Sequence, residues 1–135
     1  MEKSKVVQVF LIISGIIGMG IGGALLFAPV AFEASASINL GENINLLSEI
    51  RANGGALLSG GILILLGAFS SKLTHISLIL SSLFYLSYGF SRVLSMIIDG
   101  IPHDSLLSAT VVEIIIGLLS LFLLNRFTKN QNYIS

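Results

Sequence analysis

Four long apolar runs occupy most of this sequence, and they restrict the chain to membrane folds. The runs cover approximately residues 6–28, 46–69, 73–98 and 105–127. A bilayer core is about 30 Å thick, and a helix needs about 20 apolar residues to cross it. Only 10% of the 135 residues are charged, whereas a soluble domain carries about 25%. We therefore predict an all-α polytopic membrane protein, with four transmembrane helices bundled into one domain of residues 1–135.

The N-terminal segment has two features of a signal peptide: MEKSK is a plausible n-region, and residues 34–36 read Ala-Ser-Ala, the pattern of a cleavage site. The first run is longer than the ~7–15 apolar residues of a signal-peptide core, and we interpret it as a retained helix. Pro29 should end this helix, because proline cannot donate the backbone hydrogen bond that continuation needs. Residues 30–45 mix apolar and polar side chains, which predicts an outer amphipathic loop between helices 1 and 2.

Charges outside the runs are distributed unequally between the two sides of the membrane. Four spans place both termini and the turn at residues 70–72 on one side, which carries the basic residues Lys3, Lys5, Lys72, Arg126 and Lys129. The other side carries the acidic residues Glu33, Glu42, Asp99 and Asp104. Because basic loops remain in the cytoplasm, we expect a multi-pass protein of the cell (inner or plasma) membrane with both termini cytoplasmic.

Composition argues against several kinds of site. The chain has no cysteine, which excludes disulfides, thiolate catalysis and thiolate metal ligands. The formal net charge of +0 argues against nucleic acid as a partner. Residues 18–23 contain G-x-G-x-x-G, but inside an apolar run, without the preceding strand of a dinucleotide site. His103 has too few neighbouring ligands for a metal site, and we expect no metal and no cofactor.

Ionisable residues interrupt the apolar runs at Arg92 and Glu113. A charge in the bilayer core costs several kcal/mol, so such residues usually face the protein interior and pair with each other. At 1.5 Å per residue, Arg92 and Asn53 lie ~10 Å from the outer ends of their helices, and Glu113 lies ~12 Å from its own. We predict an ion pair between Arg92 and Glu113. The guanidinium can also fork to a second acceptor, such as Glu49 or Asn53.

Helical spacing groups more polar residues with this pair. In the third run, polar side chains recur at steps of three and four residues and form one continuous stripe. Arg51 points to a different face of the second helix, roughly opposite Asn53. The candidate polar cluster, either ligand-binding or structural, contains Glu49, Arg51, Asn53, Tyr85, Tyr88, Arg92, Asp99 and Glu113.

Small residues form two further stripes, Ser14/Gly18/Gly22 on the first helix and Ala52/Gly55/Ser59 on the second. Small side chains at this spacing let two membrane helices approach closely. The partner of the first stripe lies either in the same chain or in another. Because the two stripes exceed what one bundle needs, we expect one to be available to a second copy, which predicts a homo-oligomer.

Three segments carry a resemblance to a known family: the run from the first helix into LFAPVAFEASASINL, the segment SEIRANGG, and YGFSR followed by DGIP. With a glutamate in the last helix, they resemble the bacterial four-helix membrane family known as domain of unknown function 4345. The resemblance covers most of the chain and implies four spans but no activity. The signature positions that it implies are Glu49, Arg51, Gly54, Gly55, Arg92, Asp99, Gly100 and Glu113.

Three classes of function remain open at this point. The first is a protein that binds or helps translocate a small polar or amphipathic molecule, or a lipid head group, with Arg92 holding an anionic group and Glu113 as its counter-ion. The second is a structural or accessory membrane subunit, in which the buried pair only fixes helix packing. The third is a small intramembrane enzyme, with Glu113 or Glu49 as general base and Tyr88 as acid. The lipid bilayer is a partner in all three.

Overall fold

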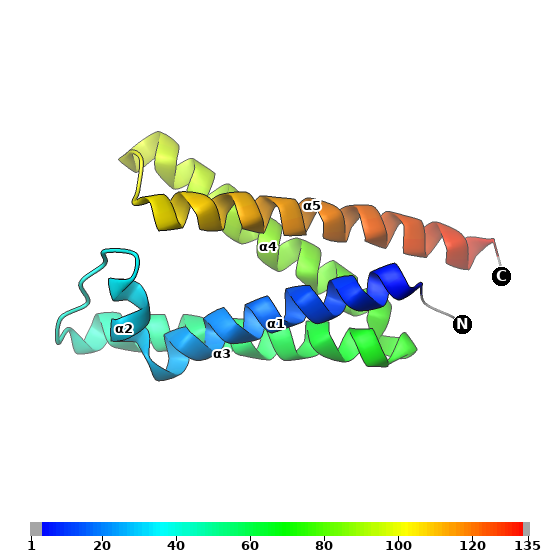
Figure 1. The fold of residues 1–135 in the computed structure, drawn as a ribbon, viewed down its shortest axis with the longest axis horizontal. Helices are drawn as coiled ribbons and strands as arrows, with labels where there is room; N and C mark the ends of the chain where they lie inside the picture. The colour runs from blue at the N-terminus through cyan, green and yellow to red at the C-terminus, as the bar shows by residue number, and fades with distance from the viewer. Residues whose placement is uncertain (1–3, 134–135) are drawn as a thin grey trace.

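The computed structural model of the chain describes residues 4–133, which form the helices α1 (Lys5–Phe27), α2 (Pro29–Ala34), α3 (Ile44–Phe69), α4 (Ser71–Asp99) and α5 (Asp104–Asn132). Four of them, α1, α3, α4 and α5, are long and apolar enough to cross a membrane (Figure 1). The described residues contain no strand. The predicted all-α fold with four transmembrane helices is therefore confirmed.

Local sequence signals explain where the helices begin and end. α1 ends at Phe27, as expected from Pro29, which occupies the first turn of α2. The side chain of Asn43 accepts a hydrogen bond at 3.1 Å from a backbone N–H in the first turn of α3. α5 extends to Asn132, beyond the predicted boundary at residue 127, because the polar residues that follow the apolar run continue the same helix outside the hydrocarbon.

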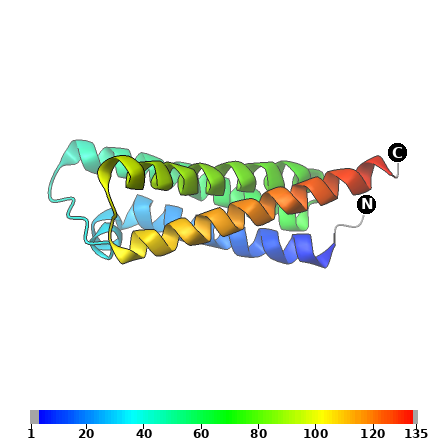
Figure 2. The same cartoon turned by 90° about the horizontal axis from the view of Figure 1, so that it is seen from above.

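The four long helices run up and down in antiparallel succession (Figures 1 and 2). α1 packs along α3, α3 along α4, and α4 along α5, whereas α1 and α5 make no extensive contact within the described residues. One end of the bundle holds the start of α1, the turn at Ser70 and the end of α5, and we call it the terminal end. The opposite end holds α2 and the turn at residues 100–103, and we call it the loop end. The bundle is thus closed on three sides and open between α1 and α5.

Glycines allow close contact between α1 and α3. A Cβ atom added to Gly54 of α3 would lie 2.6 Å from the backbone nitrogen of Leu26 and 2.8 Å from the carbonyl oxygen of Gly22. Gly18 lies against Gly61 in the same way, with 3.4 Å between an added Cβ and the Cα atom. The Ser14/Gly18/Gly22 stripe therefore finds its partner helix within the chain.

Hydroxyl groups connect the helices in the half of the bundle nearer the terminal end. Ser77 donates to the carbonyl of Leu63 at 2.7 Å, and the hydroxyls of Ser81 and Ser120 lie 2.7 Å apart. The serines Ser77, Ser81 and Ser120 are fully buried, as are the apolar side chains of Leu11, Ile64 and Leu78. Every buried side-chain nitrogen or oxygen of the described residues has a hydrogen-bond partner. This half of the bundle is thus a packed core in which the polar groups are satisfied.

Candidate functional site

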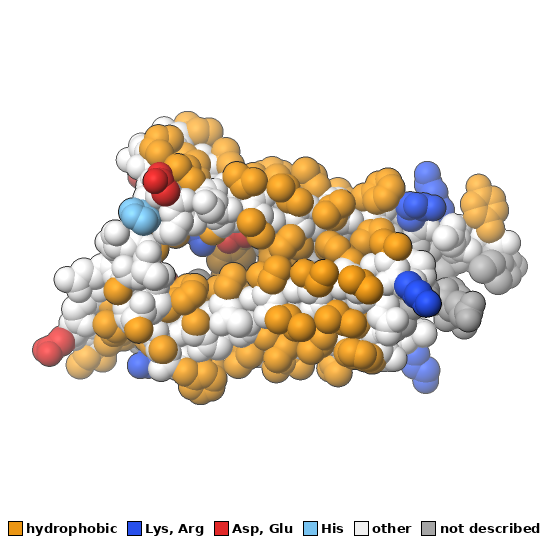
Figure 3. Space-filling view, in the orientation of Figure 1, with side chains coloured by type: hydrophobic (Ala, Val, Ile, Leu, Met, Phe, Trp, Pro, Cys, Tyr) orange, Lys and Arg blue, Asp and Glu red, His pale blue; other side chains and the backbone are white. Residues whose placement is uncertain are grey.

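A cavity of about 540 Å³ lies between the four long helices in the half of the bundle nearer the loop end. This volume is within the range of about 300–1,000 Å³ that is typical of ligand pockets. Most of the wall is apolar, and α1 and α5 contribute two of its sides through residues such as Ile21 and Val112. In the space-filling view the hollow lies on the flank of the bundle, between α1 and α5, with acidic and basic side chains inside (Figure 3). The cavity therefore opens sideways, towards the lipid.

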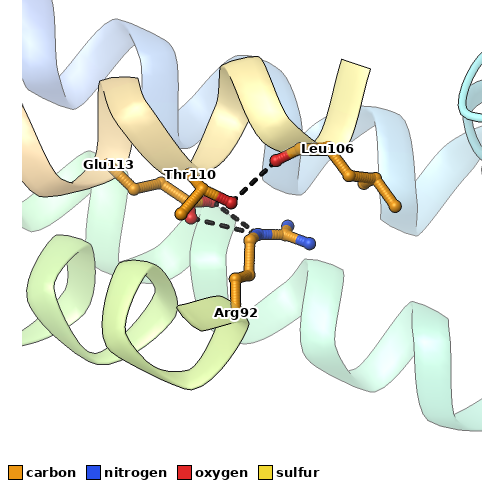
Figure 4. Close-up of polar contacts among 4 residues, drawn as sticks. All are labelled: Arg92, Leu106, Thr110 and Glu113. Carbon is orange, nitrogen blue, oxygen red and sulfur yellow. Dashed lines mark hydrogen bonds and ion pairs between the residues drawn. The ribbon is translucent and has the colours of Figure 1, made fainter. Parts of the chain in front are cut away.

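Arg92 and Glu113 meet in the cavity and form the predicted ion pair. The Nε atom of Arg92 donates to the two carboxylate oxygens of Glu113, at 3.0 Å to Oε2 and 3.3 Å to Oε1 (Figure 4). The Arg92 side chain is 33% exposed and the Glu113 side chain 12% exposed. Thr110, in the turn before Glu113, instead donates to the carbonyl of Leu106 at 2.7 Å. The carboxylate is therefore held by the guanidinium alone among the described residues.

The pair leaves part of the Arg92 guanidinium unused. The two terminal Nη groups point away from Glu113 (Figure 4) and bond to no described residue. The expected fork of Arg92 to Glu49 or Asn53 is wrong, because Glu113 is the only described residue to which the Arg92 side chain bonds; Asn53 accepts from Tyr88 instead, and Glu49 lies outside the cavity. Because an arginine carries five N–H donors and Nε uses only one, the Nη groups offer four to a molecule in the cavity.

Two tyrosines of α4 connect the cavity wall to the other helices. The hydroxyl of Tyr88 donates to Asn53 Oδ1 of α3 at 2.6 Å. The hydroxyl of Tyr85 donates to the backbone carbonyl of Ser14 in α1, and Tyr85 is only 7% exposed. Both hydroxyls therefore use their donor on the protein, which fixes the α4 face that carries Arg92.

The segment between α1 and α3 covers the loop end of the cavity. It contains the short helix α2, whereas the sequence predicted an amphipathic loop, and Phe32, Glu33 and Ile38 line the cavity. Pro29 and Leu40 are buried and anchor the two ends of this cover. We call residues 29–40 the lid.

The structure separates the eight candidate site residues into two groups. Asn53, Tyr85, Tyr88, Arg92 and Glu113 line the cavity. Arg51 does not, and its Nη1 atom donates to the backbone carbonyl of Leu26, at the end of α1. Asp99 accepts a hydrogen bond from Ser95 at 2.9 Å, at the exposed end of α4. Glu49 is exposed and bonds to no other described residue through its carboxylate.

Sequence reasoning did not include Glu33 in the site. Glu33 follows the helix-ending Pro29 within the amphipathic segment, and it is half-buried. It lines the cavity together with Arg92 and Glu113. In the sequence, Glu33 is marked only by its position directly after Phe32. This position does not indicate that the residue lies near helices that are distant in the chain.

The second small-residue stripe has no partner helix among the described residues. Ala52 and Ser59 are exposed, and a Cβ atom added to Gly55 would meet nothing within 4 Å. The hydroxyl of Ser59 donates to the carbonyl of Gly55 at 2.9 Å, within its own helix. This face of α3 is therefore open to lipid or to another chain.

The family described as "Domain of unknown function (DUF4345)" matches residues 6–124. The match reaches into all four long helices, ending within α5, and it includes every residue that lines the cavity. No curated protein and no solved structure matches the chain. The residues that the structure describes contain no group of three side chains arranged to hold a metal ion.

Proposed function

We propose that the chain, which belongs to this family, binds the anionic group of an amphipathic molecule at Arg92. The observation that carries the proposal is the guanidinium itself: its Nη donors face a cavity and are not used by the described residues. Guanidinium N–H groups match the geometry of phosphate and carboxylate oxygens. In a largely apolar cavity such a charge-assisted hydrogen bond is stronger than it is in water.

The position of the opening supports a ligand that arrives from the membrane. The cavity opens between α1 and α5, which do not pack along each other. Both helices present large exposed apolar side chains, among them Ile16 and Ile115, which suit contact with lipid. A ligand with an apolar chain can therefore place its polar group beside Arg92 while its chain remains in the bilayer. The half of the bundle near the terminal end is a packed core. This packing supports binding of a ligand in the cavity more than its translocation across the membrane.

The charge distribution supports an orientation for the site. Four of the six described Lys and Arg residues, Lys5, Lys72, Arg126 and Lys129, lie near the terminal end, where Figure 3 shows blue side chains; Arg51 and Arg92 lie in the other half. The positive-inside rule then favours cytoplasmic termini and a cavity in the outer leaflet of a bacterial inner membrane. A reporter fused after residue 133 should consequently be active in the cytoplasm, and a reporter in the lid should be active outside.

Photolabelling tests the proposed function directly. Protein in lipid nanodiscs is exposed to a photoactivatable alkyl phosphate, and the labelled fraction is measured by mass spectrometry. Arg92→Gln should lower labelling about tenfold, because each hydrogen bond to a charged group contributes about 1.5–3 kcal/mol. Arg51→Gln is the matched control, since Arg51 lies outside the cavity. Equal labelling of the wild type and Arg92→Gln would contradict the proposal.

The open face of α3 supports a second candidate, an accessory subunit that associates through Ala52, Gly55 and Ser59. Small residues at this spacing allow a second helix to pack closely, and Gly55 has open space before it. In this case the Arg92–Glu113 pair would only fix helix packing, and photolabelling would be independent of Arg92.

A further inference from the structure

The charges around the cavity do not suit a simple anion. Among the described residues of the lining, Arg92 carries a guanidinium group, and Glu113 and Glu33 each carry a carboxyl group. Glu113 is compensated by the Nε atom of Arg92. The carboxylate of Glu33 has no hydrogen-bond or ion-pair partner among the described residues. A ligand with only a negative charge would satisfy Arg92 but leave Glu33 facing a like charge.

The backbone holds Glu33 in place at the mouth of the cavity. Its carbonyl accepts hydrogen bonds at 3.0 Å from the backbone N–H groups of both Ala36 and Ile38. Leu40, at the end of the lid, is 4% exposed, so the segment that carries Glu33 is anchored on both sides. The backbone that carries Glu33 is thus held beside the cavity, on a different element from Arg92.

Arg92 and Glu33 therefore present a donor group and an acceptor group to the same space. Arg92 lies on α4 about 10 Å from the loop end of that helix, at 1.5 Å per residue. Glu33 lies on α2, which covers that end. The arrangement places the cationic site deeper in the bundle and the anionic site nearer the membrane surface. A head group that carries a phosphate close to its chains and an ammonium beyond it has the same order of charges.

We infer that the ligand is a zwitterionic phospholipid with a primary amine in its head group. Its phosphate accepts from the Nη groups of Arg92, and its ammonium donates to the carboxylate of Glu33. Its acyl chains leave the cavity between α1 and α5, on the open side of the bundle. The inference rests on the proposed function, since it specifies the chemistry of the molecule that Arg92 holds.

The test compares two phospholipids that share a phosphate and differ in the amine. Nanodiscs contain photoactivatable phosphatidylethanolamine or phosphatidylglycerol with identical acyl chains, and the labelled fraction is measured by mass spectrometry. The wild type should favour the ethanolamine lipid roughly fivefold, the scale of one partly exposed charge-assisted hydrogen bond. Glu33→Gln should label equally with both. Glu42→Gln, an acidic position of the same connection that does not line the cavity, should retain the preference.

The outcomes separate this inference from the proposed function. Arg92→Gln should lose labelling by both lipids; if it labels as the wild type does, the proposed function and the inference both fail. If labelling depends on Arg92 but the wild type does not favour the ethanolamine lipid, only the zwitterionic ligand is refuted. The zwitterionic ligand is also refuted if the Glu33→Gln variant still favours the ethanolamine lipid, or if this substitution changes the labelled fraction by the same factor with both lipids.

Discussion

The two halves of the bundle bury polar side chains in different ways. Near the terminal end, hydroxyls are paired with carbonyls or with each other, as in the contact between Ser81 and Ser120. Near the loop end, Arg92 and Glu33 line a cavity, and the described residues do not use the Nη donors of Arg92 or the carboxylate of Glu33. A short hydroxyl can be satisfied by the backbone of its own or a neighbouring helix, and so it costs little to bury. A guanidinium or carboxylate needs more partners than a close-packed bundle offers.

The difference also explains where the bundle is open. In the closed half, a small residue lets α3 and α4 approach, because Gly67 of α3 lies against the side chain of Ser77. In the open half, the bulky pair of Arg92 and Glu113 lies between α4 and α5, and the lid rather than a fifth long helix covers the space. Both halves contain polar side chains. They differ in the size of these side chains and in how many hydrogen-bonding groups the described residues leave unused.

The same substitution in each half should give the largest contrast. Ser81→Leu should lower the free energy of unfolding by about 3 kcal/mol, since it overfills a packed site and leaves Ser120 without its partner. Ser91→Leu, on the same helix but beside the cavity and exposed, should change it by less than about 0.5 kcal/mol. Detergent denaturation curves measure both. Similar losses for both variants would show that the halves do not differ in packing.

The ion pair should show a smaller but coupled effect. Arg92→Leu should destabilise the protein by about 2 kcal/mol, below the usual cost of breaking a buried pair because Arg92 is 33% exposed. Adding Glu113→Leu should recover most of this loss, because the stranded carboxylate is then removed. A double-mutant cycle of melting temperatures measures the coupling. Strictly additive effects would mean that the pair does not govern the open half.

The sequence predicted the number of membrane-spanning helices and the main ion pair, because hydropathy and the cost of isolated charges are local and general constraints. Arg92 and Glu113 are the two ionisable residues deep within apolar runs, and each compensates the other. The pattern of three and four residues also placed Tyr85 and Tyr88 on the same face as Arg92. These conclusions needed only helical geometry.

The rest depended on how helices meet, which periodicity does not contain. Arg51 and Glu49 lie close to Asn53 in sequence, but Arg51 reaches the end of α1 and Glu49 is exposed outside the cavity. Glu33 reaches the cavity only because the lid folds back over the bundle. Gly54 and Gly55 are adjacent and chemically identical, yet only the packing of α1 distinguishes them.

These two glycines provide the last and smallest comparison, within a single helix. Gly54→Ala should destabilise the chain by about 2 kcal/mol, because the new methyl group would press on the backbone of α1 at Leu26. Gly55→Ala should change stability by less than about 0.5 kcal/mol, since nothing lies within 4 Å of the added carbon. The melting temperatures of the two variants in dilute detergent, where the chain is a monomer, measure both effects.

Gly55→Leu extends the comparison to a second copy of the chain. If the open face of α3 is a homo-oligomer contact, the larger side chain should separate the copies in native mass spectra from nanodiscs while the monomer keeps its melting temperature. Gly54→Ala should instead lower the melting temperature, because that position faces α1 of the same chain. A wild-type protein that is strictly monomeric in nanodiscs would contradict the predicted homo-oligomer. Such a result would mean that lipid covers this face of α3. The Ala52/Gly55/Ser59 stripe would then contact lipid, whereas the Ser14/Gly18/Gly22 stripe contacts a helix of the same chain.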